Sequence, residues 1–153
     1  MNPRRNIYCK TGAMVFVCIL LLAAAAAAAE RMAVSVSVAN IRSGPGRSHE
    51  VLWQAEKYTP VKVLDRDQSG SWCYFADYEG TRAWLHENLL QKMDTVITKT
   101  GLCNIRSGPG TDHELVFQAQ EGVPFKVLDR KGAWIRVRHA DGDTGWIHKK
   151  LVW

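Results

Sequence analysis

The sequence predicts an all-β protein built from two small tandem barrels, and three observations predict it. A block of about 58 residues occurs twice, apolar and polar residues alternate with a period of two, and glycine and proline cluster at short intervals. No window carries the 3.6-residue apolar stripe of an amphipathic helix. Five or so short strands in so few residues favour a small, strongly curved barrel.

The first 29 residues have the pattern of a secretory signal peptide. A basic, polar start (residues 1–10) precedes an unbroken apolar run (residues 13–29), and the acidic Glu30 follows at once. Cleavage near Ala29 would place the mature chain in the periplasm or outside the cell. The alternative is an uncleaved anchor, the one case in which a membrane would be a partner, although the run is just short of the roughly 18–20 residues that span a bilayer.

Charge and composition exclude several classes of protein. The chain of 153 residues has 20 basic and 15 acidic side chains, a net charge of +5. Removing Arg4, Arg5 and Lys10 with the leader leaves 17 basic against 15 acidic side chains. A near-neutral body lacks the basic face that a nucleic-acid binder needs, so we expect no nucleic-acid partner. The apolar content of 46% is typical of a folded protein and excludes collagen-like and disordered chains.

The internal repeat defines the domains. The sequence Asn-Ile-Arg-Ser-Gly-Pro-Gly at residues 40–46 returns unchanged 64 positions later, and 17 of the 27 positions from 40 to 66 are identical. A two-residue deletion then shifts the offset to 62, in a Gly/Ser stretch where a loop tolerates a change of length. The units are predicted at residues 33–91 and 96–153. Because the connection is so short, we expect the two units to touch.

Within a unit, short strands follow one another between turns. Val34 and Val36 share one parity while Ala39 and Ile41 share the other, so a bulge is expected near Ser37, or near Gly101 in the second unit. The Ser-Gly-Pro-Gly segment predicts a tight turn. The later strands are expected around residues 61–63, 72–76 and 84–86 in unit one, and around residues 125–127, 134–138 and 146–148 in unit two.

The repeated motif resembles that of a known family. Asn-Ile-Arg-Ser-Gly-Pro-Gly, a later Trp, and Gly-Trp-Ile-His at residues 145–148 resemble the bacterial SH3-like (SH3b) domain. The resemblance implies a five- to six-stranded barrel, usually exported, that binds cell-wall peptide or another protein rather than catalysing. Trp134 followed by Gly145-Trp146-Ile147 is also similar to the core of eukaryotic SH3 domains, whose Trp lines a peptide groove. The first unit departs from the pattern at Ala83, which would strain the backbone if this position needs a positive φ.

By that analogy Trp72 and Trp134 are the first candidates for ligand contact. Both alternate with inward residues and therefore face outward, either as a lid over the barrel edge or as a binding platform. Tyr74 and Arg136 follow on the same outer face. Trp84 and Trp146 are expected to be core or barrel-closing residues. The full candidate ligand-binding set is Trp72, Tyr74, His49, Trp134, Arg136, His113 and Arg106.

The arginines and histidines of the repeat each allow two roles. Arg42 and Arg106 are favoured to hold the Gly-Pro-Gly loop through backbone carbonyls, and the alternative is a pairing with a ligand carboxylate. His49 and His113 would pack on the loop or face a ligand. The histidines at positions 49, 86, 113 and 148 recur in register, but each unit offers two of them and no third ligand, so neither a metal nor another cofactor is expected.

Two cysteines remain after the leader is removed. Cys73 and Cys103 occupy inward positions, where cysteine behaves as a small apolar residue. Export makes a disulfide between Cys73 and Cys103 chemically feasible. Against it, the two residues belong to different barrels and face their own interiors, while a bridge needs Cα atoms within about 7 Å.

The sequence predicts no catalytic site. It holds no nucleophile elbow, zinc-protease motif or phosphate-binding loop, and neither mature cysteine opens a helix. We therefore expect an exported, non-enzymatic module that recognises peptidoglycan peptide or a segment of a periplasmic protein. The alternative is a structural scaffold in which the aromatic surfaces mediate contacts between barrels or subunits.

Overall fold

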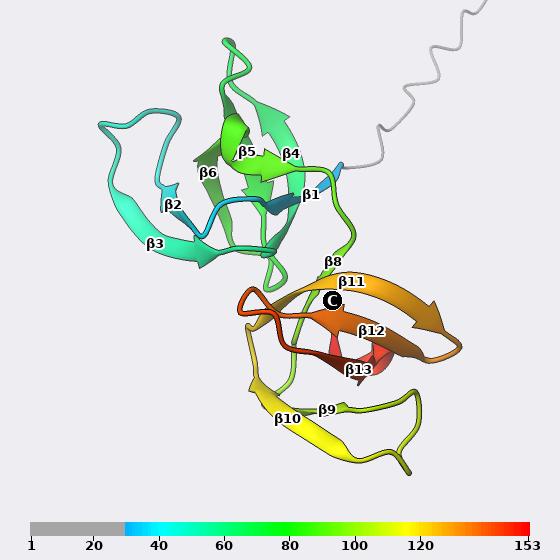
Figure 1. Ribbon diagram of the computed structural model, residues 1–153. Coiled ribbons are helices and arrows are strands. Elements are labelled where there is room, and N and C mark those ends of the chain that lie inside the picture. Colours follow the sequence, from blue (N-terminus) through cyan, green and yellow to red (C-terminus); the bar gives the residue numbers. More distant parts are fainter. Residues whose placement is uncertain (1–29) are drawn as a thin grey trace, which may run out of the picture.

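The computed structural model describes residues 30–153, and these residues form two β-barrels joined by a short connection (Figure 1). The signal peptide predicted in residues 1–29 lies outside the described residues. The first barrel is one antiparallel sheet in the order β3-β2-β6-β5-β4-β1-β7. Its strands are β1 (Arg31–Val34), β2 (Val38–Arg42), β3 (Val51–Glu56), β4 (Pro60–Arg66), β5 (Trp72–Ala76), β6 (Arg82–His86) and β7 (Leu90–Gln91).

The second barrel repeats this arrangement in the order β10-β9-β13-β12-β11-β8. Its strands are β8 (Thr95–Ile97), β9 (Leu102–Arg106), β10 (Leu115–Gln120), β11 (Pro124–Lys131), β12 (Trp134–Arg138) and β13 (Thr144–His148). Each barrel has one 3₁₀ turn, η1 (Glu87–Leu89) or η2 (Lys149–Leu151), after its last long strand. The prediction of two tandem all-β barrels is confirmed. No helix of residues 30–153 has the length and apolar character needed to cross a membrane.

Each barrel encloses its own apolar core, because every second residue of its strands points inward. Phe75 on β5 fills the first core and Phe125 on β11 fills the second, and both are fully buried. The repeat places Val137 where the first barrel has Phe75, and Val61 where the second has Phe125. One phenylalanine and one valine therefore fill each core from exchanged positions, which conserves volume as a packed interior requires.

The parity change before the repeated motif has a different cause from the one predicted. The sequence predicts a bulge near Ser37 or Gly101, whereas the chain breaks the strand there: β1 ends at Val34 and β2 begins at Val38. The register shifts lie elsewhere, for example between Val63 and Asp65 on β4, where the pairing with β5 slips by one residue. Bulges of this kind increase the local twist and help a short sheet to curve into a barrel.

The two barrels touch, as expected from the short connection. The guanidinium carbon of Arg31, on β1, lies 4.0 Å from the ring centroid of Trp153 at the end of the second barrel. Elsewhere in this contact between the barrels, which we call the seam, Gly122 of the second barrel lies close to Tyr78 of the first. A Cβ atom built on Gly122 would lie 3.5 Å from the hydroxyl oxygen of Tyr78. Strands β4 and β8 also approach each other, so the seam involves both sheets.

Candidate ligand groove

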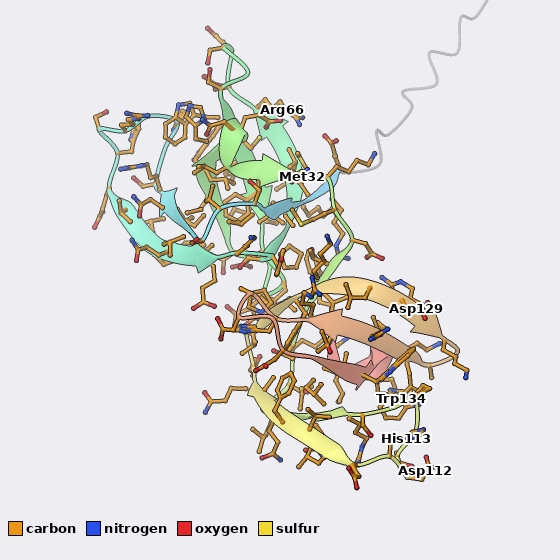
Figure 2. The ribbon with its side chains drawn as sticks, in the orientation of Figure 1. Met32, Arg66, Asp112, His113, Asp129 and Trp134 are labelled. Atoms are coloured by element: carbon orange, nitrogen blue, oxygen red, sulfur yellow. The ribbon has the colours of Figure 1, made fainter. Side chains whose placement is uncertain are left out.

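Trp72 and Tyr74 lie on the outer face of the first barrel. Along β5, Cys73 and Phe75 are buried while Trp72 and Tyr74 are half-buried, so the predicted outward direction is confirmed. In β12 the same alternation leaves Trp134 half-buried and Arg136 exposed. Figure 2 shows Trp134 and His113 on the part of the second barrel that lies away from the first.

Trp84 and Trp146 join this outer face, and the prediction of a core position for their side chains is wrong. Their neighbours Ala83, Leu85, Gly145 and Ile147 take the inward positions. The Trp84 ring packs on Tyr74, with 5.0 Å between ring centroids. The barrel-closing role is correct for the backbone, because Trp84 pairs with Arg42 where β6 meets β2, and Trp146 pairs with Arg106.

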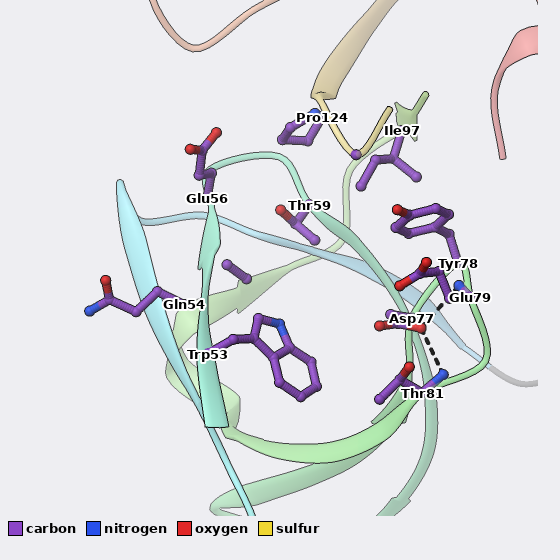
Figure 3. A pocket seen from close by; sticks show the side chains of 12 residues that line it. Trp53, Gln54, Glu56, Thr59, Asp77, Tyr78, Glu79, Thr81, Ile97 and Pro124 are labelled. Atoms are coloured by element: carbon purple, nitrogen blue, oxygen red, sulfur yellow. Dashed lines mark hydrogen bonds between the residues drawn. The ribbon is translucent and has the colours of Figure 1, made fainter. Parts of the chain in front are cut away.

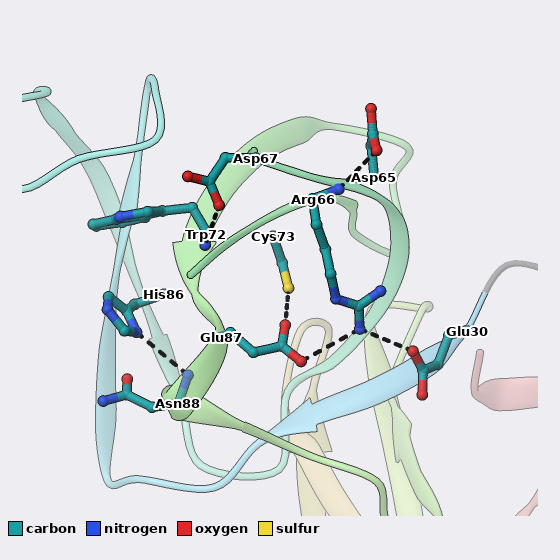
Figure 4. A network of polar contacts seen from close by, with 9 residues as sticks. All are labelled: Glu30, Asp65, Arg66, Asp67, Trp72, Cys73, His86, Glu87 and Asn88. Atoms are coloured by element: carbon teal, nitrogen blue, oxygen red, sulfur yellow. Dashed lines mark hydrogen bonds and ion pairs between the residues drawn. The ribbon is translucent and has the colours of Figure 1, made fainter. Parts of the chain in front are cut away.

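A histidine supports each outer tryptophan. His86 lies directly across from Trp72 in the β5–β6 pairing, and their rings meet edge to face at 5.1 Å (Figure 4). Its Nδ1 accepts a hydrogen bond from the backbone N–H of Asn88 and so caps the η1 turn. Trp134 and His148 repeat the arrangement at 5.3 Å. The recurrence of these histidines was visible in the sequence, but their pairing with the tryptophans depends on the strand register.

A shallow groove of about 400 Å³ runs beside Trp72. We name it the Trp72 groove, and it is lined by Val38, Asn40, Arg42, Arg47, Trp72, His86, Asn88 and Leu89. The lining combines one large aromatic surface with two arginines and two side-chain amides, and it includes no carboxylate. Such a surface suits an extended polar chain that carries a negative charge.

The arginines of the repeated motif hold the loop that borders the groove. Nη1 of Arg42 donates to the backbone carbonyls of Arg47, at 3.0 Å, and His49, at 2.7 Å. Arg106 makes the equivalent bond to His113 at 2.9 Å. The favoured role of these arginines is thus confirmed. The guanidinium of Arg47 makes no hydrogen bond or ion pair within residues 30–153 and is free to meet a ligand.

His49 and His113 pack on the loop. A Cβ atom on Gly44 would lie 2.6 Å from the His49 ring, and one on Gly108 would lie 2.5 Å from His113. Only glycine leaves room for this contact, which explains why the motif needs glycine at this position. His49 is absent from the lining of the Trp72 groove. Of the candidate ligand-binding residues predicted in the first barrel, Trp72 lines the groove, whereas Tyr74 and His49 do not.

A polar network lies next to Trp72, on the core side of β5. The buried Cys73 thiol donates to a carboxylate oxygen of Glu87, whose other oxygen pairs with Arg66 at 3.3 Å (Figure 4). Arg66 also pairs with Glu30 at 2.9 Å, and the hydrogen bonds that it donates to Glu30 and Glu87 raise the pKa of this guanidinium. Burial, followed by the hydrogen bond to Glu87, raises the pKa of the Cys73 thiol to about 12. Cys73 is therefore a protonated core residue.

The disulfide considered between Cys73 and Cys103 is not formed. Both cysteines are free and buried, and each belongs to the core of its own barrel. Cys103 instead lies 3.3 Å from the hydroxyl of Thr100. Since the side chains point into separate interiors, no rotamer change alone could bring the two sulfur atoms together.

The substitution of glycine by Ala83 causes no backbone strain. The equivalent Gly145 does not have a positive φ, so the predicted reason for glycine at this position is wrong. Its true constraint is space, because a Cβ atom there would lie 2.5 Å from Cγ2 of Ile105 and 3.0 Å from the carbonyl oxygen of Arg106. In the first barrel the methyl group of Ala83 fits and is buried. Ala83 therefore leaves this part of the first barrel undisturbed.

No group of three or more His, Cys, Asp or Glu side chains converges to hold a metal ion within residues 30–153.

Two models of the family described as "Bacterial SH3 domain" match the chain. One matches residues 37–91 and the other matches residues 99–153, so each covers one barrel.

Relatives with curated names match over shared segments. A Bacillus subtilis protein, YrvJ, whose name assigns it provisionally to the N-acetylmuramoyl-L-alanine amidases, is 27% identical over 130 residues, which is 78% of this chain and 24% of that protein. A Staphylococcus epidermidis protein, LytH, named provisionally as a cell wall amidase, is 36% identical over 61 residues, which is 39% of this chain and 21% of that protein. The chain thus spans about a quarter or less of these relatives.

Among solved structures, an NlpC/P60 family protein from Bacillus cereus is 16% identical. The match covers 81% of this chain and 56% of that one, with a TM-score of 0.38.

Proposed function

The chain belongs to the bacterial SH3 domain family, which it contains twice in tandem, and from that premise we propose that it is an exported binding module for cell-wall peptide. The Trp72 groove carries this proposal. Its aromatic surface, amides and free Arg47 suit a peptide that bears a carboxylate. Domains of this family often bind the cell wall, and the names of two relatives refer to cell-wall substrates.

Each side chain has a separate task in the proposed complex. Trp72 supplies flat contact area that is already fixed by His86, so little conformational entropy is lost on binding. Asn40 and Asn88 offer donors and acceptors to the peptide backbone, and Arg47 pairs with a carboxylate. In the second barrel, Trp134, Arg136 and Arg106 would provide an equivalent surface. The two barrels together would bind a polymer with higher avidity than either alone.

The proposed role is recognition without catalysis. The relatives named as amidases extend far beyond the matched segments, and the matched segments are the SH3 domains. We propose that this chain shares their means of attachment and not their chemistry. A scaffold role, in which Trp72 and Trp134 bury each other between subunits, is the alternative outcome of the test below.

Co-sedimentation with purified sacculi tests the proposal. We expect wild-type protein to sediment, and Trp72→Ala to weaken binding by about tenfold, as for truncation of a central aromatic contact. Trp134→Ala reports on the second barrel. Leu64→Ala is the matched control, because it truncates an exposed apolar residue outside the groove. Absence of wild-type protein from the pellet would refute wall binding, and dimerisation lost in Trp72→Ala would support the scaffold.

A further inference from the structure

A second hollow, the inter-barrel pocket, lies at the seam, near the end of β5 that is farther along the chain from Trp72. It has a volume of about 390 Å³, and residues of both barrels line it (Figure 3). Trp53 from β3 and Tyr78 from the β5–β6 turn contribute aromatic surface, and Ile97 and Pro124 approach from the second barrel. None of these residues lines the Trp72 groove, so the two sites are separate.

Packing against the core and against the second barrel fixes the aromatic residues of the pocket. Trp53 is half-buried and meets the core residue Phe75 edge to face, at 6.5 Å between ring centroids. Tyr78 is half-buried against the second barrel, close to Gly122. An indole face fixed by a packed core is a ready surface for a cation or a flat apolar group.

The rim of this pocket is negatively charged. Glu56, Asp77 and Glu79 line it, and no Lys, Arg or His does. Asp77 is fixed because its Oδ1 accepts from the backbone N–H groups of Glu79, at 3.0 Å, and Thr81, at 2.8 Å. Glu56 and Glu79 have no ion-pair partner within residues 30–153. Burial and then the charges of Glu79, Glu121 and Asp77 raise the pKa of Tyr78, which is consistent with a negative potential at the pocket.

The repeat supplies a less acidic counterpart of the same hollow. In the second barrel a hollow of about 340 Å³ is lined by Phe117, Gln120 and His139, which stand where the first barrel has Trp53, Glu56 and Asp77. The fold therefore forms the hollow in both copies. The second copy has a single carboxylate, Asp143, together with His139, while the indole and the set of three carboxylates belong to the first copy. The charge complementarity belongs to this pocket and is not a general property of the barrel.

We propose that the inter-barrel pocket binds an alkylammonium group, the side chain of a lysine or a similar diamino acid in an extended peptide. The ammonium group would lie over the Trp53 ring beside the acidic rim, and its aliphatic stem would contact Ile97 and Pro124. A cation over an indole face is attracted by the ring, and the negative potential of the unpaired rim carboxylates stabilises it further. This site does not depend on the function proposed for the Trp72 groove.

An NMR titration of the ¹⁵N-labelled protein tests this assignment. With Nα-acetyl-lysine methylamide, we expect shifts at the Trp53 indole N–H and at the amides of Tyr78 and Thr81, with an affinity of about millimolar. The shifts should shrink as salt is added. Nα-acetyl-norleucine methylamide has the same stem without the charge and should give at least fivefold weaker binding. Equal binding of the two compounds, or no shift with the lysine compound, would overturn the proposal.

Two double variants test whether the carboxylates of the pocket, and not acidic residues elsewhere on the surface, bind the lysine compound. Glu56→Gln/Glu79→Gln should weaken lysine binding about tenfold without changing the fold, because both side chains are exposed. Glu50→Gln/Glu114→Gln removes the same charge outside the pocket and should leave binding unchanged. Residues around Phe117 should show no shift, and Trp72→Ala should not alter the titration. If the first double variant binds as wild type does, the carboxylates are not the recognition element and the proposal fails.

Discussion

At the scale of single residues, Cys73 gives the clearest prediction. Its folded pKa of about 12 lies above the ordinary thiol value of about 8.5. The folded state therefore keeps a proton that the unfolded state releases, so the free energy of unfolding falls as the pH rises from about 9 to about 12. Each pH unit in this window lowers it by up to about 1.4 kcal/mol. Below that window the thiol contributes no pH dependence.

Urea unfolding from pH 7 to pH 11, compared between wild type and Cys73→Val, measures this contribution. Other groups titrate in both proteins, so the difference between the two curves isolates the thiol. We expect the wild type to lose stability more steeply than Cys73→Val above pH 9. Parallel curves would mean that the thiol ionises equally well in the folded state.

At the scale of strands, the crossing of β13 and β9 is a tightly packed point of the second barrel. Gly145→Ala would drive a methyl group into Ile105 and the carbonyl of Arg106, and overpacking of this kind costs about 1–3 kcal/mol. Ala83→Gly, at the equivalent position on β6, should cost about 1 kcal/mol through lost burial and added backbone freedom. Gly101→Ala is the control, because a Cβ atom there meets nothing within 4 Å. Chemical denaturation of the three variants checks these values, and a Gly145→Ala protein as stable as wild type would show that the crossing can widen freely.

The same strands show which features of the fold could be predicted from the sequence alone. The duplication and the period of two were enough to predict two barrels, the inward Cys73 and the outward Trp72. The parity of β6 was misjudged because Trp84 is large and apolar, whereas its position in the alternation puts Ala83 and Leu85 inside. The reason for glycine at position 145 was also out of reach, since a close approach of two strands leaves no local signature. The partnership of Trp72 with His86 depends on the register of β5 against β6, which the alternation of apolar and polar residues does not fix.

At the scale of the whole molecule, the protein has two sites of opposite charge, and one of them lies at the seam between the barrels. The Trp72 groove is lined by arginines, the inter-barrel pocket is lined by carboxylates, and the second barrel forms one wall of the latter. Relative movement of the barrels would therefore change the pocket and leave the groove intact. Individual contacts such as that between Arg31 and Trp153 should contribute measurably to the seam.

Arg31→Ala should therefore loosen the second barrel although the mutated residue belongs to the first. The guanidinium of Arg31 covers the ring of Trp153, whose backbone exchanges hydrogen bonds with Ile97 on β8. Removing a partly exposed cation–π contact costs about 0.5–1 kcal/mol. Hydrogen exchange at the Ile97 and Trp153 amides should accordingly become about two- to fivefold faster, while Arg47→Ala, on the groove side of the first barrel, should leave these amides unchanged. Exchange that stays at the wild-type rate in Arg31→Ala would show that this contact does not stabilise the pairing of Ile97 with Trp153.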